Sequence, residues 1–470
     1  MASPSPAAAV FQDDAVYGQR YHKAAAGLRV LHEALDARRP LGSANEAAFL
    51  AQVAWLKEQP DEAFARVWQD PTAYWWVRNG YHLMAVLAGT VTLTGSGRDL
   101  IQALGADTPA AALDLHLGQF SRFVLGVAAV AGTDRALDPG LAVRLPFAIP
   151  GTHWVLDGDQ PVRILGISGG AVDVATERDG TLRVPLGGHA GAGSPGVHEA
   201  VTIAMDGHSL ALLPELYNNL PGLAFTRALD GVGARFQRAH ADLLTTALEA
   251  MGRYAPGVRQ AFLDHTWSVA LKPLKAGDFT NMAHSELPGT FIAAAIPNAL
   301  EMADTLIHEF HHHHLFFLEE AGPFFRGDGP DPLEDAHFYS PWRPDPRPLH
   351  GILHGAFVYT PVNDFWLQAL RSGDLQGEDR EYALDRLGRG LAQIHLGLRQ
   401  LDRHGALTGH GQRVVAAIGE RLGACLAAAR AMGLPDAAEI SARRCEEEGQ
   451  YTPVPGGAGG GAASLAEDLR

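Results

Sequence analysis

The stretch from Pro297 to Glu319 reads PNALEMADTLIHEFHHHHLFFLE and contains an H-E-x-x-H motif at His308-Glu309-Phe310-His311-His312. Residues four apart lie on one face of a helix, so His308 and His312 can offer two imidazoles to a single metal ion. Glu309 would then lie beside that ion, where zinc hydrolases place a general base. The stretch therefore predicts a helix that carries a metal site.

The predicted helix runs from about Ala299 to Glu319. Asn298 followed by Glu301 resembles a capping box in which Asn replaces the usual Ser or Thr. A strand predicted over 289–296 leads straight into the helix, and this order is typical of zincin-type metal domains. We therefore expect an α+β, mainly helical fold, with a zincin-like metal-site core and an inserted small antiparallel β region.

The composition indicates a soluble globular protein with two or three domains, because 47% of the 470 residues are hydrophobic and 19% are charged. The net charge of −16 argues against nucleic acid or an anionic membrane as a partner, since both favour a concentrated basic surface. The sequence has only two cysteines, Cys425 and Cys445, and it lacks a basic, apolar export signal at its start. We expect a cytoplasmic protein.

Changes of pattern along the chain divide it into five parts. Tryptophans 55, 68, 75 and 76 are expected to anchor the helical core of the first part. Short β-prone runs between Gly, Pro and Asp define the second part. The predicted parts are an N-terminal helical region (1–137), a small antiparallel β region (138–213), a zincin-like catalytic core (214–372), a C-terminal helical region (373–452) and a disordered tail (453–470).

Further elements are expected near the motif. A strand is predicted over 268–271, and helices are predicted over about 349–370, 379–404 and 411–432. Within the motif helix, His311 lies on nearly the same face as His308, whereas His313 and His314 turn away and are expected to pack or to face solvent.

A catalytic metal needs a third protein ligand. The metzincin pattern is excluded, because positions 315 and 318 are both Leu. Glu334 lies at about the spacing of a gluzincin ligand. We favour His354, which shares a helix face with His350, and we place His350 as its support. Both histidines could instead pack in the core.

Three protein ligands suit either a hydrolytic zinc ion or a non-haem iron that binds 2-oxoglutarate and dioxygen. An oxygenase also needs a cation for the distal carboxylate of 2-oxoglutarate. Arg343 and Arg347 lie just ahead of His354 on a proline-rich segment, although each could instead pair with Asp345. Tyr339 and Ser340 could donate further hydrogen bonds.

At these residues the chain resembles a bacterial family of H-E-x-x-H-containing peptide-modification proteins. Its members accompany precursor peptides in gene clusters for ribosomal natural products, and some are Fe(II)- and 2-oxoglutarate-dependent hydroxylases of a peptide β-carbon. The resemblance covers about residues 280–360. It is carried by His284–Gly289, Asn298–Leu315, Tyr339–Arg343, Arg347-Pro348 and Leu353–Gly355.

The resemblance implies that His308 and His312 hold Fe(II) and that His354 completes the set, with Glu334 and Asp335 in reserve. Dioxygen and 2-oxoglutarate would be the co-substrates, and a precursor peptide would be the substrate. The residues expected to bind 2-oxoglutarate are Arg343, Arg347, Tyr339 and His350. Glu309 would orient a ligand or a water.

Two other functions stay open. A zinc metallopeptidase would use Zn²⁺ with Glu309 as its general base. A binding module stabilised by a metal without catalysis would tolerate the loss of Glu309 and of both arginines.

Overall fold

The computed structural model describes residues 10–11, 14–93, 95–178, 180–187, 194–221, 229, 232–274, 281–327, 338–343 and 345–433. The chain forms two compact units. The first unit comprises Met1–Tyr17, Leu243–Asp264 and Ile296–Arg470, and the second unit comprises Gly18–Asp242 and His265–Ala295. Each unit therefore combines segments that lie far apart in the sequence.

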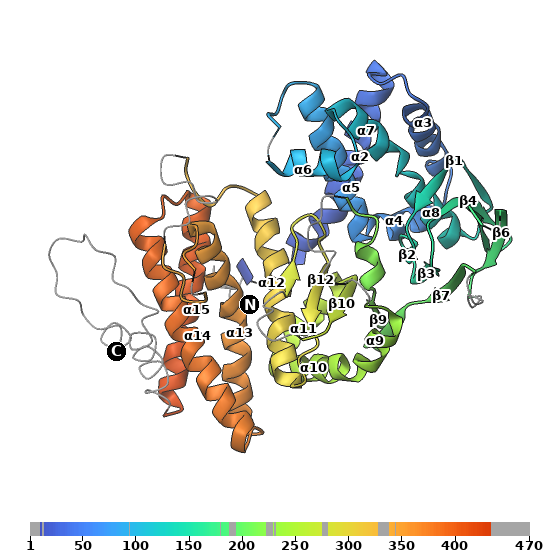
Figure 1. Cartoon of the computed structure of the whole chain (residues 1–470). Coiled ribbons are helices and arrows are strands. Elements are labelled where there is room, and N and C mark those ends of the chain that lie inside the picture. The colour runs from blue at the N-terminus through green and yellow to red at the C-terminus, as the bar shows by residue number, and fades with distance from the viewer. Residues whose placement is uncertain are drawn as a thin grey trace. The chain divides into compact units, whose positions relative to one another are not determined.

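Helices dominate the N-terminal part of the second unit, as predicted (Figure 1). Side chains cap three of them, since Ser43, Asp70 and Thr108 accept backbone hydrogen bonds at helix starts. Trp68, Trp75 and Trp76 are at most 1% exposed, which confirms them as core anchors, whereas Trp55 is only partly buried. The helices are α2 (Asp14–Arg38), α3 (Ala44–Leu56), α4 (Asp61–Trp68), α5 (Pro71–Leu87), α6 (Gly95–Ala103), α7 (Pro109–Gly118) and α8 (Ser121–Ala131).

Two small antiparallel sheets follow these helices, as the turn-rich sequence predicts. The first has the strand order β1-β4-β5-β6 and the second has the order β2-β3-β7. The strands are β1 (Arg135–Val143), β2 (Phe147–Ala148), β3 (Trp154–Asp157), β4 (Val162–Ser168), β5 (Ala171–Thr176), β6 (Gly180–Pro185) and β7 (Gly196–Glu199).

A third sheet is mixed, with the order β11-β12-β10-β9-β8. The hairpin of β8 (Val201–Met205) and β9 (His208–Leu212) belongs to this sheet, because β9 pairs in parallel with β10 (Ser268–Lys272). Strand β10 also pairs in parallel with β12 (Thr290–Ala294), which pairs with β11 (Met282–Ala283). The antiparallel hairpin at 201–212, predicted as part of the small β region, therefore also joins a mixed sheet. Strand periodicity does not reveal that β9 pairs with a strand 57 positions further on.

Every residue of β10 and β12 is buried, as is typical of strands covered on both faces. Between β9 and β10 lie η1 (Pro214–Tyr217), α9 (Ala234–Ala239), α10 (Ala241–Tyr254) and α11 (Pro256–His265). Most of α10 and α11 belongs to the first unit.

The remaining helices of the first unit are α12 (Ala299–Glu320), α13 (Leu349–Ser372), α14 (Gly377–His404) and α15 (Gly409–Ala431). Their bounds confirm the four helices predicted from periodicity. Helices α13, α14 and α15 lie side by side (Figure 1), and α13 also packs against α12. These contacts assemble the surroundings of the motif.

The fold is mixed α+β and mainly helical, as predicted. The zincin-like arrangement of strand and helix stays a prediction, because β12 and α12 belong to different units. No helix among the described residues is both long and apolar enough to cross a membrane. The predicted tail over 453–470 lies outside the described residues, as do Glu334 and Asp335.

Candidate metal centre

The motif helix begins at the predicted cap. The side-chain oxygen Oδ1 of Asn298 accepts hydrogen bonds from the backbone N–H groups of Leu300 (2.8 Å) and Glu301 (3.1 Å). These bonds satisfy two of the amides that the first turn of a helix leaves unpaired. The cap fixes where α12 starts and therefore which side chains share a face further along.

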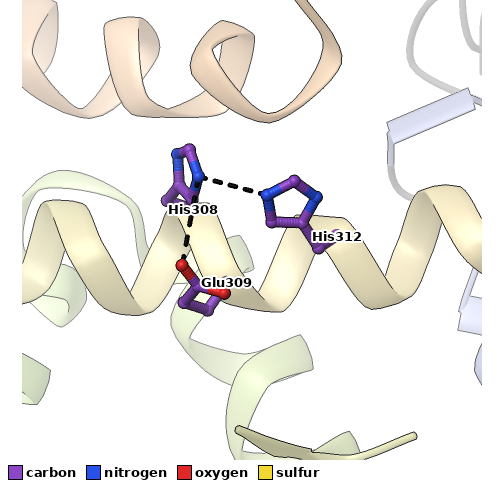
Figure 2. A group of neighbouring side chains, drawn as sticks. All are labelled: His308, Glu309 and His312. Carbon is purple, nitrogen blue, oxygen red and sulfur yellow. Dashed lines mark hydrogen bonds and ion pairs between the residues drawn. The ribbon is translucent and has the colours of Figure 1, made fainter. Parts of the chain in front are cut away.

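His308 and His312 point to the same side of α12 (Figure 2), and their Nε2 atoms lie 3.2 Å apart. Two nitrogen ligands at about 2.1 Å from one ion, roughly at a right angle, are separated by about 3 Å. The spacing therefore fits two neighbouring ligands of a single transition-metal ion. This is the arrangement predicted from the i, i+4 motif.

Both imidazoles are held neutral. Burial, followed by the positive charge of Arg386, lowers the pKa of His308 to about 3. Burial also lowers the pKa of His312 well below its ordinary value, and His308 adds to the effect. A metal binds the neutral imidazole, so the pair does not have to lose protons before it binds an ion near neutral pH.

Glu309 lies beside this pair. Its side chain is only 4% exposed, and its Oε1 lies 4.0 Å from Nε2 of His308 (Figure 2). His308, Glu309 and His312 together form a group whose ligand atoms all lie within 4.8 Å of one another. The carboxylate can therefore act on a water or a ligand at the ion, or bind the ion itself.

His354 contacts the imidazole ring of His312 at its Nδ1 edge. Its Nδ1 lies 3.0 Å from Nδ1 of His312, whereas the Nε2 atom of His312 faces His308. The structure instead groups His354 with Glu319 and His350. In this geometry the predicted third ligand, His354, contacts the candidate ligand His312 and does not belong to the group formed by His308, Glu309 and His312.

His350 occupies the other side of this second group. Its Nε2 lies 3.0 Å from both carboxylate oxygens of Glu319, and its ring centroid lies 4.4 Å from that of His354. The predicted shared helix face of His350 and His354 is therefore confirmed. Glu319, at the end of α12, was not singled out in the sequence.

The two predicted arginines pair with the acidic residue between them. Nε of Arg343 lies 3.1 Å from Oδ1 of Asp345, and Nε of Arg347 lies 3.0 Å from Oδ2. The side chains of Arg343 and Arg347 are 56% and 33% exposed. Among the described residues, no contact joins either arginine to His308 or His312. Tyr339 is half-buried on the same segment.

A different arginine lies near the motif. Arg386 of α14 donates from Nε to Oδ2 of Asp304 over 3.1 Å, and Nε1 of Trp366 donates to the same oxygen over 2.7 Å. Asp304 precedes His308 by one helical turn. Although burial acts in the opposite direction, Asp304 and neighbouring tyrosines raise the pKa of Arg386 above its ordinary value. The guanidinium of Arg386 therefore stays protonated and positively charged.

Tyr359 of α13 links this cation to the motif. Its ring packs edge-on against His308 with centroids 4.8 Å apart, and the guanidinium of Arg386 lies 6.0 Å from its centroid. Burial raises the pKa of Tyr359, so its hydroxyl keeps its proton. Sequence reasoning missed Arg386 and Tyr359, because neither has a fixed spacing from the motif.

The surplus histidines of α12 are buried. His311 contacts the carbonyl of Ile307 through Nδ1 over 2.7 Å, and burial lowers its pKa to about 4. His314 contacts the hydroxyl of Tyr17 through Nδ1 over 3.0 Å, and His313 is 2% exposed. Of the two roles predicted for His313 and His314, packing or facing solvent, their burial fits packing.

Comparison with known proteins found no family model and no curated protein that matches the chain. The chemistry of the centre therefore has to be argued from its own residues. Two neutral imidazoles, a neighbouring carboxylate and a permanent cation can bind a divalent transition metal and an anionic ligand beside it.

Proposed function

We propose that the protein is an Fe(II)- and 2-oxoglutarate-dependent hydroxylase that adds a hydroxyl group to the β-carbon of a residue in a ribosomally made precursor peptide. The observation that carries the proposal is the pair of imidazoles with Nε2 atoms 3.2 Å apart, near the half-buried cation Arg386. The resemblance of residues 280–360 to the peptide-modification family supplies the class of substrate.

His308 and His312 would hold the ion through Nε2, and an octahedral ion would then have positions for a bidentate keto acid, for dioxygen and for one further ligand, for which Glu309 is the nearest candidate. Bound Fe(II) would supply the reduction of dioxygen, with 2-oxoglutarate decarboxylated to succinate. The residues around it bind and orient the reactants. Glu309 lies close enough to His308 to hold a water or a ligand at the ion.

Arg386 is the better candidate for the distal carboxylate of 2-oxoglutarate than Arg343 or Arg347. The guanidinium of Arg386 donates from Nε and Nη2 to Asp304. A guanidinium carries five N–H donors, so others remain for a second anion. A cation fixed in this way can receive a carboxylate without first becoming ordered. Its side chain is 24% exposed, so an anion can reach it.

His354 would set the orientation of His312. When His312 binds an ion through Nε2, its Nδ1 carries the proton and donates to Nδ1 of His354. Such a partner fixes the tautomer and the ring angle of a metal ligand. His350 and Glu319 support His354 from its far side.

A zinc metallopeptidase is the alternative, and one observation favours it. A distance of 4.0 Å between the Glu309 carboxylate and His308 Nε2 leaves room for a water on a bound zinc ion to meet a general base. This alternative gives the half-buried cation Arg386 no necessary role.

Anaerobic titration of the metal-free protein with Fe(II) and then with 2-oxoglutarate tests the proposal. The expected result is a weak visible charge-transfer band that needs both additions and is lost in His308→Ala. His410→Ala is the matched control, since His410 contacts a backbone carbonyl at the end of α12 and should keep the band. A missing band, with one zinc ion held tightly, would refute the oxygenase.

Glu309→Gln separates the two enzymes. In a metallopeptidase this change removes the general base and should lower peptide hydrolysis by about 100-fold or more. In the hydroxylase it should leave the charge-transfer band of Fe(II) and 2-oxoglutarate in place, because the two histidines still hold the ion.

A further inference from the structure

The second unit contains a cavity of about 1010 Å³ that shares no residue with the histidine groups. Its walls come mainly from α7, α8, β1 and the segment around η1. Its volume is at the upper end of the range for small-molecule sites. Arg122, Arg144, Arg163, Glu215, Asn218 and Asn219 supply most of its charged and polar groups.

Arg122 is a buried cation in the wall of this cavity. Its side chain donates from Nη2 to Oε1 of Gln119 (2.7 Å) and to the carbonyl of Asn219 (3.0 Å). Its Nε has no hydrogen-bond partner among the described residues, and none of their carboxylates lies within ion-pair distance of it. The residue is only 3% exposed, and burial lowers its pKa to about 10.

A buried guanidinium without a paired anion is costly, because it has lost its hydration without gaining a counter-charge. The negative charge of Asp70 acts on Arg122, but the carboxylate of Asp70 already accepts hydrogen bonds from Thr72 and Gly151. Since Arg122 lines the cavity, a ligand in the cavity can supply a further anion partner.

The other charges of the cavity favour an anion as well. Arg144 and Arg163 are exposed at its edge. Glu215 is the only carboxyl among the described lining residues, and burial raises its pKa to about 7. This carboxyl therefore opposes an anion only weakly near neutral pH, and a proton on it would make it a hydrogen-bond donor.

We infer that this cavity binds a small molecule that carries two or more carboxylate or phosphate groups, with one anionic group on the buried Arg122 and another near Arg144 or Arg163. The site lies in a different unit from the metal centre, so the inference does not depend on the proposed function. It is a net cationic cavity in a protein whose total charge is −16.

Calorimetric titration of the full chain with citrate and with inorganic pyrophosphate tests the inference and distinguishes carboxylate from phosphate. We expect one equivalent of at least one of the two anions to bind. Arg122→Gln should weaken binding at least tenfold. Because Arg122 is buried and its loss can disturb folding, Arg144→Gln serves as an exposed second variant, with an expected weakening of several-fold.

Arg178→Gln is the matched control, because Arg178 is exposed in the same β region and does not line the cavity. Its affinity should equal that of the unchanged protein. The inference is overturned if neither anion binds, if Arg178→Gln weakens binding as much as Arg144→Gln, or if both cavity variants bind with unchanged affinity.

Discussion

At the scale of single residues, the centre depends on which edge of each imidazole faces which neighbour. His312 presents Nε2 to His308 and Nδ1 to His354, so its two nitrogens serve different partners. One neutral imidazole has one donor and one acceptor. Under the proposed function, this division of roles would make His308 and His312 the ligands and His354 the residue that orients His312.

Substitution of His354 tests this division. His354→Ala should weaken metal binding by about 10- to 100-fold, since it removes a partner of a ligand and not the ligand itself. His354→Asn keeps an acceptor and should recover part of that loss, as measured by competition with a chelator. Complete loss of the metal in both variants would instead make His354 a ligand.

Arg386→Lys tests the proposed co-substrate anchor. Lysine keeps the charge beside Asp304 but loses the planar set of donors, so we expect the KM for 2-oxoglutarate to rise at least tenfold. Arg343→Gln is the control, because Arg343 is 56% exposed and pairs with Asp345. An equal rise in both variants, measured by succinate formation, would contradict the assignment of Arg386.

The burial of His116 predicts that the stability of the second unit depends on pH. It is fully buried against Trp76, and burial lowers its pKa to about 4. The unfolded chain binds a proton near pH 6.5 and the folded chain does not, so the free energy of unfolding falls as the pH drops from 6.5 towards 4.

In His116→Gln this contribution is absent. Between pH 7.5 and pH 5, the variant should therefore lose about 2 kcal/mol less of its unfolding free energy than the unchanged protein does. Urea unfolding at both pH values measures the difference. Parallel losses in the two proteins would show that His116 is already protonated when folded.

At the scale of helices, the close packing of the Trp342 ring against α13 and α14 depends on two glycines, one in each helix. A Cβ atom added at Gly355 of α13 or at Gly397 of α14 would lie 2.6 Å from the ring of Trp342. The same ring stacks on Tyr359, with centroids 5.9 Å apart and planes 9° apart. Trp342 thus connects the proline-rich segment to α13, α14 and the residue that contacts His308.

Gly355→Ala should therefore destabilise the protein by about 1–3 kcal/mol, because it forces the Trp342 ring to move. Gly351→Ala on the same helix is the control, since its nearest neighbour would lie 3.8 Å away. That change should stabilise the protein by roughly 0.5–1 kcal/mol, as alanine does inside helices. Thermal unfolding of both variants checks the two signs.

At the scale of the whole molecule, the two units carry different chemistry. Both histidine groups lie on α12 and α13 of the first unit, whereas the arginine-lined cavity belongs to the second. An ion that binds the folded centre stabilises the unit that contains it.

Removal of the metal should therefore weaken the first unit alone. At an ion concentration about 100 times Kd, the stabilisation is about 2.7 kcal/mol. Hydrogen exchange with and without a chelator should show faster exchange in α12 and α13, with α5 and α8 unchanged. Equal acceleration in α5 and α8 would show that the metal stabilises the whole chain.

The sequence by itself determined the features that depend on neighbours along the chain. The i, i+4 spacing brings His308 and His312 together because a helix repeats every 3.6 residues, and Asn298 starts that helix through local hydrogen bonds. The same reasoning predicted α13, α14 and α15 from their apolar periodicity.

Only the tertiary structure decided which distant side chains meet. Arg386 lies 78 positions after His308, and no local pattern in the sequence relates the two. Whether Arg343 turns to the candidate metal centre or to Asp345, and which edge of His312 receives His354, depend on how α12, α13 and α14 pack. Helix and strand periods determine the faces of an element, but the partner of each face is selected by packing between segments remote in sequence.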